Sequence, residues 1–127
     1  MNLIENKERI FSQVAQAIET ANRTDQVNVI AVTKYVGIDQ AKALVDTGVR
    51  HIGENRVDKF LEKYQALKDE GLTWHLIGSL QRRKVKEVIN YVDYFHALDS
   101  MKLAQEIQKR ASHPIKCFIQ VNISGEE

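Results

Sequence analysis

The sequence predicts an α/β fold built on a parallel sheet, and three observations support this class. Five short runs of β-branched, aromatic and other apolar residues alternate with segments whose apolar residues recur at helical spacing. The predicted strands begin at positions 27, 49, 73, 94 and 115, so successive strands start 21 to 24 residues apart. Each interval leaves room for a helical crossover between parallel strands. A doubly wound sheet and a (β/α)₈ barrel both begin in this way, and the spacing does not separate them.

Each predicted element is bounded by a turn or cap signal. The strands are expected at residues 27–32, 49–52, 73–77, 94–97 and 115–121. The helices between them are expected to begin at polar capping residues, namely Asp39, Asn55, Ser79 and Ser100. Gly48 and Gly71 should end the first two of these helices, and the third should run from about residue 80 to 89. An amphipathic helix precedes the first strand and is expected to lie on the sheet.

The composition is that of one globular domain. The chain has 127 residues, of which 43% are hydrophobic and 28% are charged. Its formal net charge of +1 gives no overall attraction to nucleic acid or to an anionic membrane. Cys117 is the only cysteine, which excludes an intrachain disulfide and is typical of a reducing compartment. The amino terminus lacks the apolar core of a signal peptide, so we expect a cytoplasmic protein without membrane spans.

Polar residues and glycines gather where the predicted strands end. Because the carboxyl ends of parallel strands share one side of the sheet, these residues should be neighbours. They are Thr33, Lys34, Gly53, Glu54, Asn55, His75, Gly78, Ser79, His96, Asp99, Asn122 and Ser124. Lys34 leaves an apolar strand directly at this rim, where partial burial favours the neutral amine that a nucleophile requires. The alternative is a lysine that extends into solvent.

Other residues have weaker functional interpretations. Arg82, Arg83, Lys84 and Lys86 place cations in the first turns of a predicted helix. They form either a contact for phosphate or RNA or a solvated basic face. The four histidines show no helical i, i+4 pairing, so no metal site is assigned. Cys117 alternates with apolar residues and is expected in the core.

Four strings at the predicted strand ends resemble successive motifs of the pyridoxal phosphate homeostasis proteins, also called the YggS or PROSC family. The strings are AVTK at 31–34, IGEN at 52–55, WHLIGSLQ at 74–81 with Lys84, and QVNIS at 120–124. The resemblance implies an alanine-racemase-like barrel that holds pyridoxal 5′-phosphate (PLP) as a Schiff base on the lysine of the first strand, which is Lys34. It further implies that Asn55 approaches the cofactor and that His75 lines the same pocket.

The resemblance also implies a partial (β/α)₈ TIM barrel of about five parallel strands with an added N-terminal helix. We expect one incomplete PLP-binding barrel domain over 1–127, with the helix in 1–24 and the first five βα units in 25–127. Family members carry three further strands, including the loop that grips the phosphate. Without that loop, PLP binding should weaken by about 10²- to 10⁴-fold. Exposed strand edges should favour self-association or completion by a missing C-terminal segment.

The function implied by this resemblance is intracellular PLP homeostasis. The chain would be a carrier without catalysis of its own and would serve PLP-requiring apoenzymes. The alternative is a PLP-dependent amino-acid racemase-like enzyme, which would need a second base opposite Lys34. Sequence alone assigns that role to none of the four tyrosines, which are Tyr35, Tyr64, Tyr91 and Tyr94. A third interpretation is a small polyanion-binding module built on the basic residues 82–86.

Overall fold

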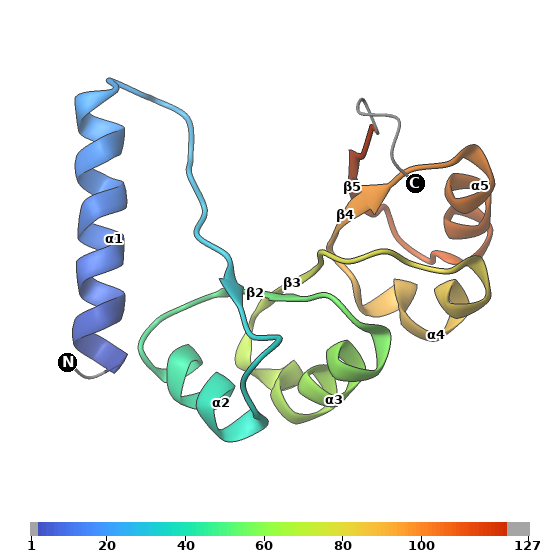
Figure 1. Ribbon diagram of the computed structural model, residues 1–127, viewed down its shortest axis with the longest axis horizontal. Coiled ribbons are helices and arrows are strands. Elements are labelled where there is room, and N and C mark those ends of the chain that lie inside the picture. The colour runs from blue at the N-terminus through green and yellow to red at the C-terminus, as the bar shows by residue number, and fades with distance from the viewer. Residues whose placement is uncertain (1–2, 122–127) are drawn as a thin grey trace.

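A computed structural model describes residues 3–121 and contains a five-stranded parallel sheet (Figure 1). The strands lie side by side in chain order, and each pairs in parallel with its neighbours. They are β1 (Ala31–Val32), β2 (His51–Glu54), β3 (Thr73–Leu76), β4 (Tyr94–Leu98) and β5 (Lys116–Ile119). The predicted α/β class is confirmed. A doubly wound sheet would reverse its strand order part-way, whereas the order within residues 3–121 runs in one direction, as in a barrel wall.

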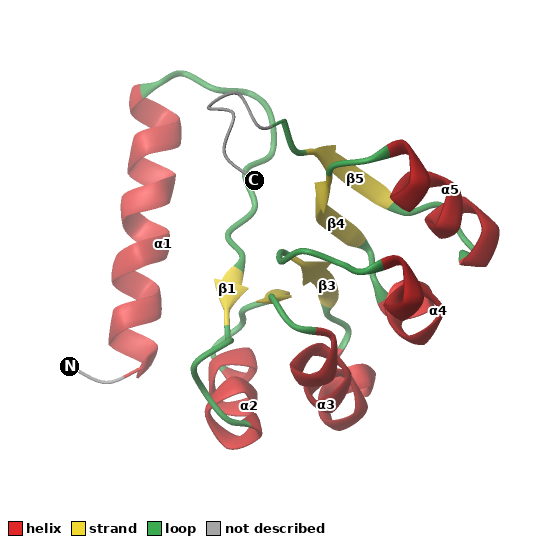
Figure 2. Ribbon diagram, turned by 45° about the vertical axis from the view of Figure 1, so that its right-hand side comes forward, coloured by secondary structure: helices red, strands yellow, loops and turns green. Residues whose placement is uncertain are grey.

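Helices cover one face of the sheet, while α1 stands apart at the β1 end (Figure 2). The α-helices are α1 (Leu3–Thr20), α2 (Ile38–Asp46), α3 (Val57–Leu67), α4 (Val85–Val88) and α5 (Met101–Arg110). Short 3₁₀ turns flank two of them, namely η1 (Lys68–Glu70), η2 (Arg82–Lys84) and η3 (Ile89–Tyr91). None of the helices in the described range is long and apolar enough to cross a membrane.

The hydrophobic core lies between the sheet and helices α2 to α5. Alternate residues of β3 point into it, so that Trp74 and Leu76 are almost fully buried. The ring of Phe60 on α3 meets Trp74 edge-on, with the centroids 5.5 Å apart. The opposite face of the sheet carries no helix from the described part of the chain and leaves Val32 and Phe118 more than half exposed, at 51% and 56%. The sheet is therefore packed on one side and open on the other.

Three predicted boundary signals are confirmed. The Ser100 hydroxyl accepts a hydrogen bond from the backbone N–H of Leu103 at 3.1 Å, as expected for an N-cap. Gly48 and Gly71 follow the ends of their helical segments with φ of 107° and 71°. Only glycine adopts such angles without steric cost, which is why the chain turns at these two positions.

The other three cap predictions are wrong. Asp39 lies inside the first turn of α2, whereas Asn55 and Ser79 lie one residue or more before the cap position of the next helical segment. The residues found at the cap positions are Gly37, Arg56 and Gln81, and none of them makes a side-chain cap hydrogen bond. Asp39 still favours its helix, because a carboxylate in the first turn interacts well with the helix dipole.

The helix expected from about residue 80 to 89 is broken into three pieces. Only the four residues of α4 are α-helical, and 3₁₀ turns precede and follow them. The preceding turn holds three cations in succession at the amino end of the segment, where the dipole disfavours positive charge. Buried, β-branched Val85, Val88 and Ile89 tie the segment to the core. Packing therefore decides the position of this segment more than helix propensity does.

The amino-terminal part of the chain also differs from expectation. The first strand is Ala31–Val32 and not the whole of 27–32, because β1 is at the sheet edge and only these residues pair with β2. The fifth strand is likewise shorter, at Lys116–Ile119. The first helix stands beside the β1 end of the sheet and does not lie across it as expected, although Phe11 packs against the core. No residue of α1 is buried, and its apolar side borders a hollow with the segment that leads into β1.

Candidate functional site

Lys34 lies in the turn directly after β1. The backbone N–H of Thr33 donates to the carbonyl of Gly53 at 3.0 Å, which extends the β1–β2 ladder to the residue before Lys34. Val32 lies on the open face and Thr33 is buried on the other side, and Lys34 belongs to the turn that follows them. Lys34 is partly buried, and its Nζ lies 5.1 Å from the centroid of the Tyr35 ring. Within residues 3–121 this amine has no hydrogen bond and no ion pair.

Asn55 follows β2 in the turn that leads into α3. The strand register aligns Val32 with Gly53, so Lys34 and Asn55 both stand two residues beyond an aligned pair. Asn55 is partly buried and borders a hollow between its own turn and the turn after β3. The other residues around this hollow are Arg56, Val57, Asp58, Ser79, Gln81 and Lys84. Asn55 thus lies level with Lys34 along the strand direction. The hollow that Asn55 borders, however, faces the turn after β3.

The turns after β2 and β3 approach each other closely at Gly78. A Cβ placed on Gly78 would lie 2.1 Å from the backbone oxygen of Asn55 and 2.9 Å from its carbonyl carbon. Both of these are main-chain atoms, which cannot move aside as the end of a side chain can. The position of Asn55 therefore depends on the absence of a side chain at Gly78.

His75 is the middle member of a row of three histidines on the open face of the sheet. Its Nε2 lies 3.0 Å from Nδ1 of His51 on β2, and its Nδ1 lies 3.0 Å from Nε2 of His96 on β4. Only 3% of His75 is exposed, and the Tyr94 ring stacks on it with centroids 4.7 Å apart. The register pairs His75 with Gly53 and with Tyr94, so each imidazole reaches its neighbour diagonally, two residues farther along the next strand.

This histidine row can hold one added proton and no more. Each of its two contacts needs one N–H donor and one bare nitrogen. The three rings have six nitrogens, and two of these must stay unprotonated to act as acceptors. At most four nitrogens can therefore carry a proton, whereas three neutral imidazoles carry three protons in total. A second added proton must therefore break one of the contacts. Burial, with smaller contributions from His96 and His51, lowers the pKa of His75 from its usual 6.5 to about 4.

The lowered pKa of His75 predicts a loss of stability in mild acid. The unfolded chain takes up a proton near pH 6.5, whereas folded His75 does so near pH 4. The stability is thus fully present above pH 6.5 and falls as the pH drops toward 4. We expect the free energy of unfolding, measured with urea, to fall by on the order of 2 kcal/mol between about pH 8 and pH 5. His75→Phe should make the free energy of unfolding depend less on pH, whereas His113→Phe should leave its pH dependence unchanged. An equal pH dependence in the original chain and in both variants would contradict the assignment of this effect to His75.

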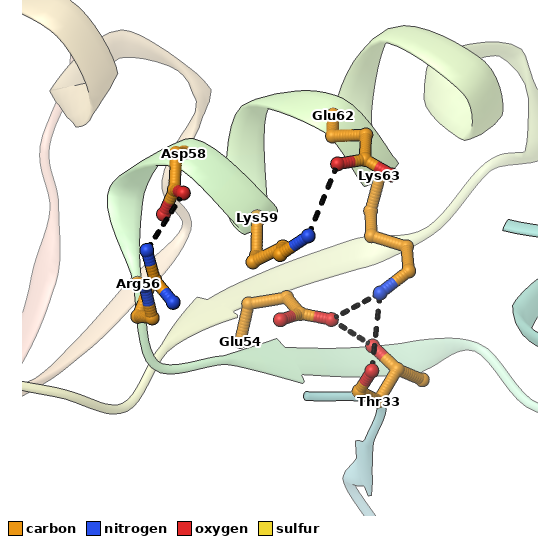
Figure 3. A network of polar contacts seen from close by, with 7 residues as sticks. All are labelled: Thr33, Glu54, Arg56, Asp58, Lys59, Glu62 and Lys63. Atoms are coloured by element: carbon orange, nitrogen blue, oxygen red, sulfur yellow. Dashed lines mark hydrogen bonds and ion pairs between the residues drawn. The ribbon is translucent and has the colours of Figure 1, made fainter. Parts of the chain in front are cut away.

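A buried ion pair contacts Thr33, the residue before Lys34, on the helix side of the sheet (Figure 3). Lys63 of α3 donates from Nζ to Oε2 of Glu54 at 2.8 Å and to the backbone oxygen of Thr33 at 3.0 Å. The side chains of Lys63 and Glu54 are 2% and 0% exposed. The Thr33 hydroxyl donates to the same carboxylate oxygen of Glu54. Among the described residues, the other oxygen, Oε1, is buried without a hydrogen-bond partner.

Sequence reasoning noted Thr33 and Glu54 at the strand ends but missed Lys63. A signal for it exists in the helical spacing. Lys63 lies three residues after Phe60 and four before Leu67, and both of these are buried core residues of α3. A lysine on the apolar stripe of a helix must find a buried partner, and the chain supplies one in Glu54.

Comparisons with known proteins identify relatives over the whole chain, although no family model matches it. The pyridoxal phosphate homeostasis protein of Aquifex aeolicus is 40% identical over 131 residues, which cover 100% of this chain and 58% of that protein. The protein of the same name from Pasteurella multocida is 32% identical and is covered to 57%. The chain is a homologue of the pyridoxal phosphate homeostasis proteins. The resemblance found in the strand-end motifs is thereby confirmed.

Solved structures agree with this homology. PipY of Synechococcus elongatus PCC7942 without PLP superposes with a TM-score of 0.82 at 30% identity, covering 96% of this chain and 54% of PipY. The structure of PipY with PLP bound gives a TM-score of 0.72 at 31% identity, with 85% and 47% covered. The chain spans a little over half the length of the pyridoxal phosphate homeostasis proteins named above.

The remaining predicted residues have varied surroundings. Asn122 and Ser124, expected at the end of the fifth strand, lie outside the described residues. Cys117 is partly buried and packs against the core, and burial raises the pKa of its thiol. In the basic segment, Arg82 and Arg83 are exposed and Lys84 pairs with Glu87 at 3.7 Å. This arrangement favours the solvated basic face over a polyanion site.

Proposed function

We propose that this chain binds pyridoxal 5′-phosphate at the carboxyl-end rim of the sheet, with Lys34 as the residue that bonds to it. The observation that carries the proposal is Lys34 itself, which is partly buried in the turn after β1 and whose amine has no carboxylate partner among residues 3–121. Such an amine has no ion pair to break before it reacts. When bound, the cofactor would supply an aldehyde, and the Lys34 nitrogen would hold it as a Schiff base, with the aldehyde oxygen released as water.

Three residues near Lys34 have different expected roles at the site. Gly53 lies on the next strand, and a Cβ placed there would meet Cγ2 of Ile30 at 3.1 Å and Cγ2 of Ile77 at 3.6 Å, so these two isoleucines already fill the space over Gly53 and give the site an apolar floor. Asn55 supplies an amide at the height of Lys34 that can orient a polar ring substituent. Both nitrogens of His75 are engaged in the histidine row, so we propose that His75 contributes a neutral wall to the pocket.

We further propose that residues 25–127 are the first five βα units of a barrel and that the helix in 1–24 is added to it. The one-directional strand order and the helices on a single face support this arrangement. The cations beside Asn55 are already paired, Arg56 with Asp58 at 2.9 Å and Lys84 with Glu87 at 3.7 Å. We therefore expect the bond to Lys34 to dominate PLP binding by this chain, with a modest overall affinity.

The surroundings favour a carrier in cytoplasmic PLP homeostasis, with PLP-requiring apoenzymes as recipients, over a racemase-like enzyme. Racemisation needs a second base across the cofactor from the lysine. Tyr64 packs against Trp74 on the helix side of the sheet. Tyr94 is stacked on His75, and Tyr35 follows Lys34 directly and is 89% exposed. These surroundings mark none of the three hydroxyls as a second base.

The proposal is tested by trapping. The chain is mixed with PLP and treated with borohydride, and the reduced adduct is mapped by mass spectrometry. We expect labelling at Lys34, which disappears in Lys34→Arg. Lys86→Arg is the matched control, because Lys86 is exposed on α4 and should leave the labelling at Lys34 unchanged. Labelling spread evenly over surface lysines would contradict the proposal, and racemisation of amino acids by the same sample would favour the enzyme.

The open face of the sheet also predicts self-association. Val32 and Phe118 expose apolar side chains on the face that carries no helix, at 51% and 56%. We expect size-exclusion chromatography with light scattering to give a mass above that of one chain. Phe118→Ser should shift the equilibrium toward the monomer. Met101→Ser is the control, because it removes a side chain that is 73% exposed on α5, and it should have little effect on the measured mass. If the original chain is a monomer at all concentrations, the prediction of self-association is refuted.

A further inference from the structure

Thr33, the residue before Lys34, is fixed at every polar atom that it has. Its N–H donates to the carbonyl of Gly53 at 3.0 Å, and its own carbonyl accepts from Nζ of Lys63 at 3.0 Å. Its hydroxyl donates to Glu54. The carbonyl oxygen of Thr33 also accepts a hydrogen bond from the N–H of Val36 at 3.2 Å, and this bond closes the turn that contains Lys34. Four hydrogen bonds thus hold Thr33, the residue that directly precedes Lys34.

The three residues of this buried network come from three different elements. Thr33 follows β1, Glu54 ends β2 and Lys63 lies in the middle of α3. A hydrogen bond with a charged partner contributes more than a neutral one, and Thr33 makes two such bonds. β1 itself has only two residues, so its ladder with β2 is too short to fix the turn alone. The network supplies the restraint that the strand lacks.

We infer that Glu54 and Lys63 are positioning residues, which act through Thr33 to hold the turn from which the Lys34 side chain departs. The inference that the turn is held for PLP binding rests on the proposed function. The inference that the network holds the turn rests on the four hydrogen bonds of Thr33. The network lies on the helix side of the sheet. It acts by keeping Lys34 from swinging out toward solvent, where its amine would be one surface lysine among many. An orienting effect of this kind is worth about 10- to 100-fold in the rate of a reaction.

Thr33→Val and Thr33→Ser form the matched pair for the test. Valine keeps the shape of threonine and removes the hydroxyl, whereas serine keeps the hydroxyl. A second variant, Glu54→Leu with Lys63→Met, replaces the whole ion pair by apolar side chains, a change that folded proteins commonly tolerate. Two measurements are made on each folded protein: amide hydrogen exchange over residues 34–36, and the rate at which PLP and borohydride label Lys34 relative to Lys86.

We expect Thr33→Val and the double variant to speed amide exchange in the turn by about 10-fold and to slow labelling of Lys34 relative to Lys86 by about 10-fold or more. Thr33→Ser should behave as the original chain does. Unchanged exchange in the turn of the double variant would overturn the inference, whatever the chain does with PLP. Faster exchange with unchanged labelling of Lys34 would also overturn it. Failure of the original chain to label at Lys34 at all would instead remove the proposed function, while hydrogen exchange still decides whether the network holds the turn.

Discussion

Lys63→Met is expected to lower the free energy of unfolding by about 3–5 kcal/mol. The substitution leaves Glu54 as a fully buried carboxylate with the Thr33 hydroxyl as its remaining side-chain partner. Its oxygen Oε1 already has no partner within the described part of the chain, so the site has no spare donor to compensate. The Thr33 carbonyl loses a donor as well. Urea denaturation at neutral pH measures the change.

The double variant Glu54→Leu with Lys63→Met is the control for this result. It removes both charges together, and replacing a buried pair by apolar side chains of similar volume is often close to neutral. The double variant should therefore recover most of the stability that the single variant loses. Lys59→Met offers a second comparison, because Lys59 forms an exposed pair with Glu62 on the same helix, worth less than about 1 kcal/mol. Equal losses for Lys63→Met and Lys59→Met would refute the importance of the buried pair.

Gly78→Ala is expected to lower the free energy of unfolding by about 1–3 kcal/mol and to disturb the rim. The added methyl group would stand 2.1 Å from the backbone oxygen of Asn55, so one of the two turns must move. Because Asn55 lies at the height of Lys34, a shift of its turn should also slow the labelling of Lys34 by PLP. Urea denaturation and the trapping experiment measure the two effects.

Gly37→Ala is the matched control for Gly78→Ala. Gly37 precedes α2 with φ of −82°, and a Cβ added there would have no heavy atom within 4 Å. Its replacement should change stability by less than about 1 kcal/mol and leave labelling at Lys34 intact. If Gly78→Ala is no more harmful than Gly37→Ala, the close approach of the two turns does not constrain the site.

The strands and the rim were predictable because they depend on local patterns. Short apolar runs, the Ser100 cap and the glycines at positions 48 and 71 each act within a few residues, and the parallel topology then brings the strand ends together. The resemblance of four strings to the homeostasis-protein motifs added Lys34 as the residue of interest. Three of these strings, AVTK, IGEN and WHLIGSLQ, contain the last residue of a strand, which is why they mark one rim.

The contacts across strands could not be read from the sequence. His51, His75 and His96 are 24 and 21 residues apart, and only the register of three strands decides that each faces the next. A shift of one residue would send every second side chain to the other face. Lys63 was missed because a charged residue on an apolar stripe reads as solvent-exposed until its buried partner is known.

The neighbour-by-neighbour order of the strands has a consequence for how the chain folds. Each strand pairs with the one that was synthesised just before it, about 20 residues earlier. A nascent chain leaving the ribosome can therefore add its βα units one at a time onto a template that already exists. Units near the amino terminus would be protected first and the last strand would be the latest to dock, giving a vectorial assembly that pulse labelling during translation would reveal.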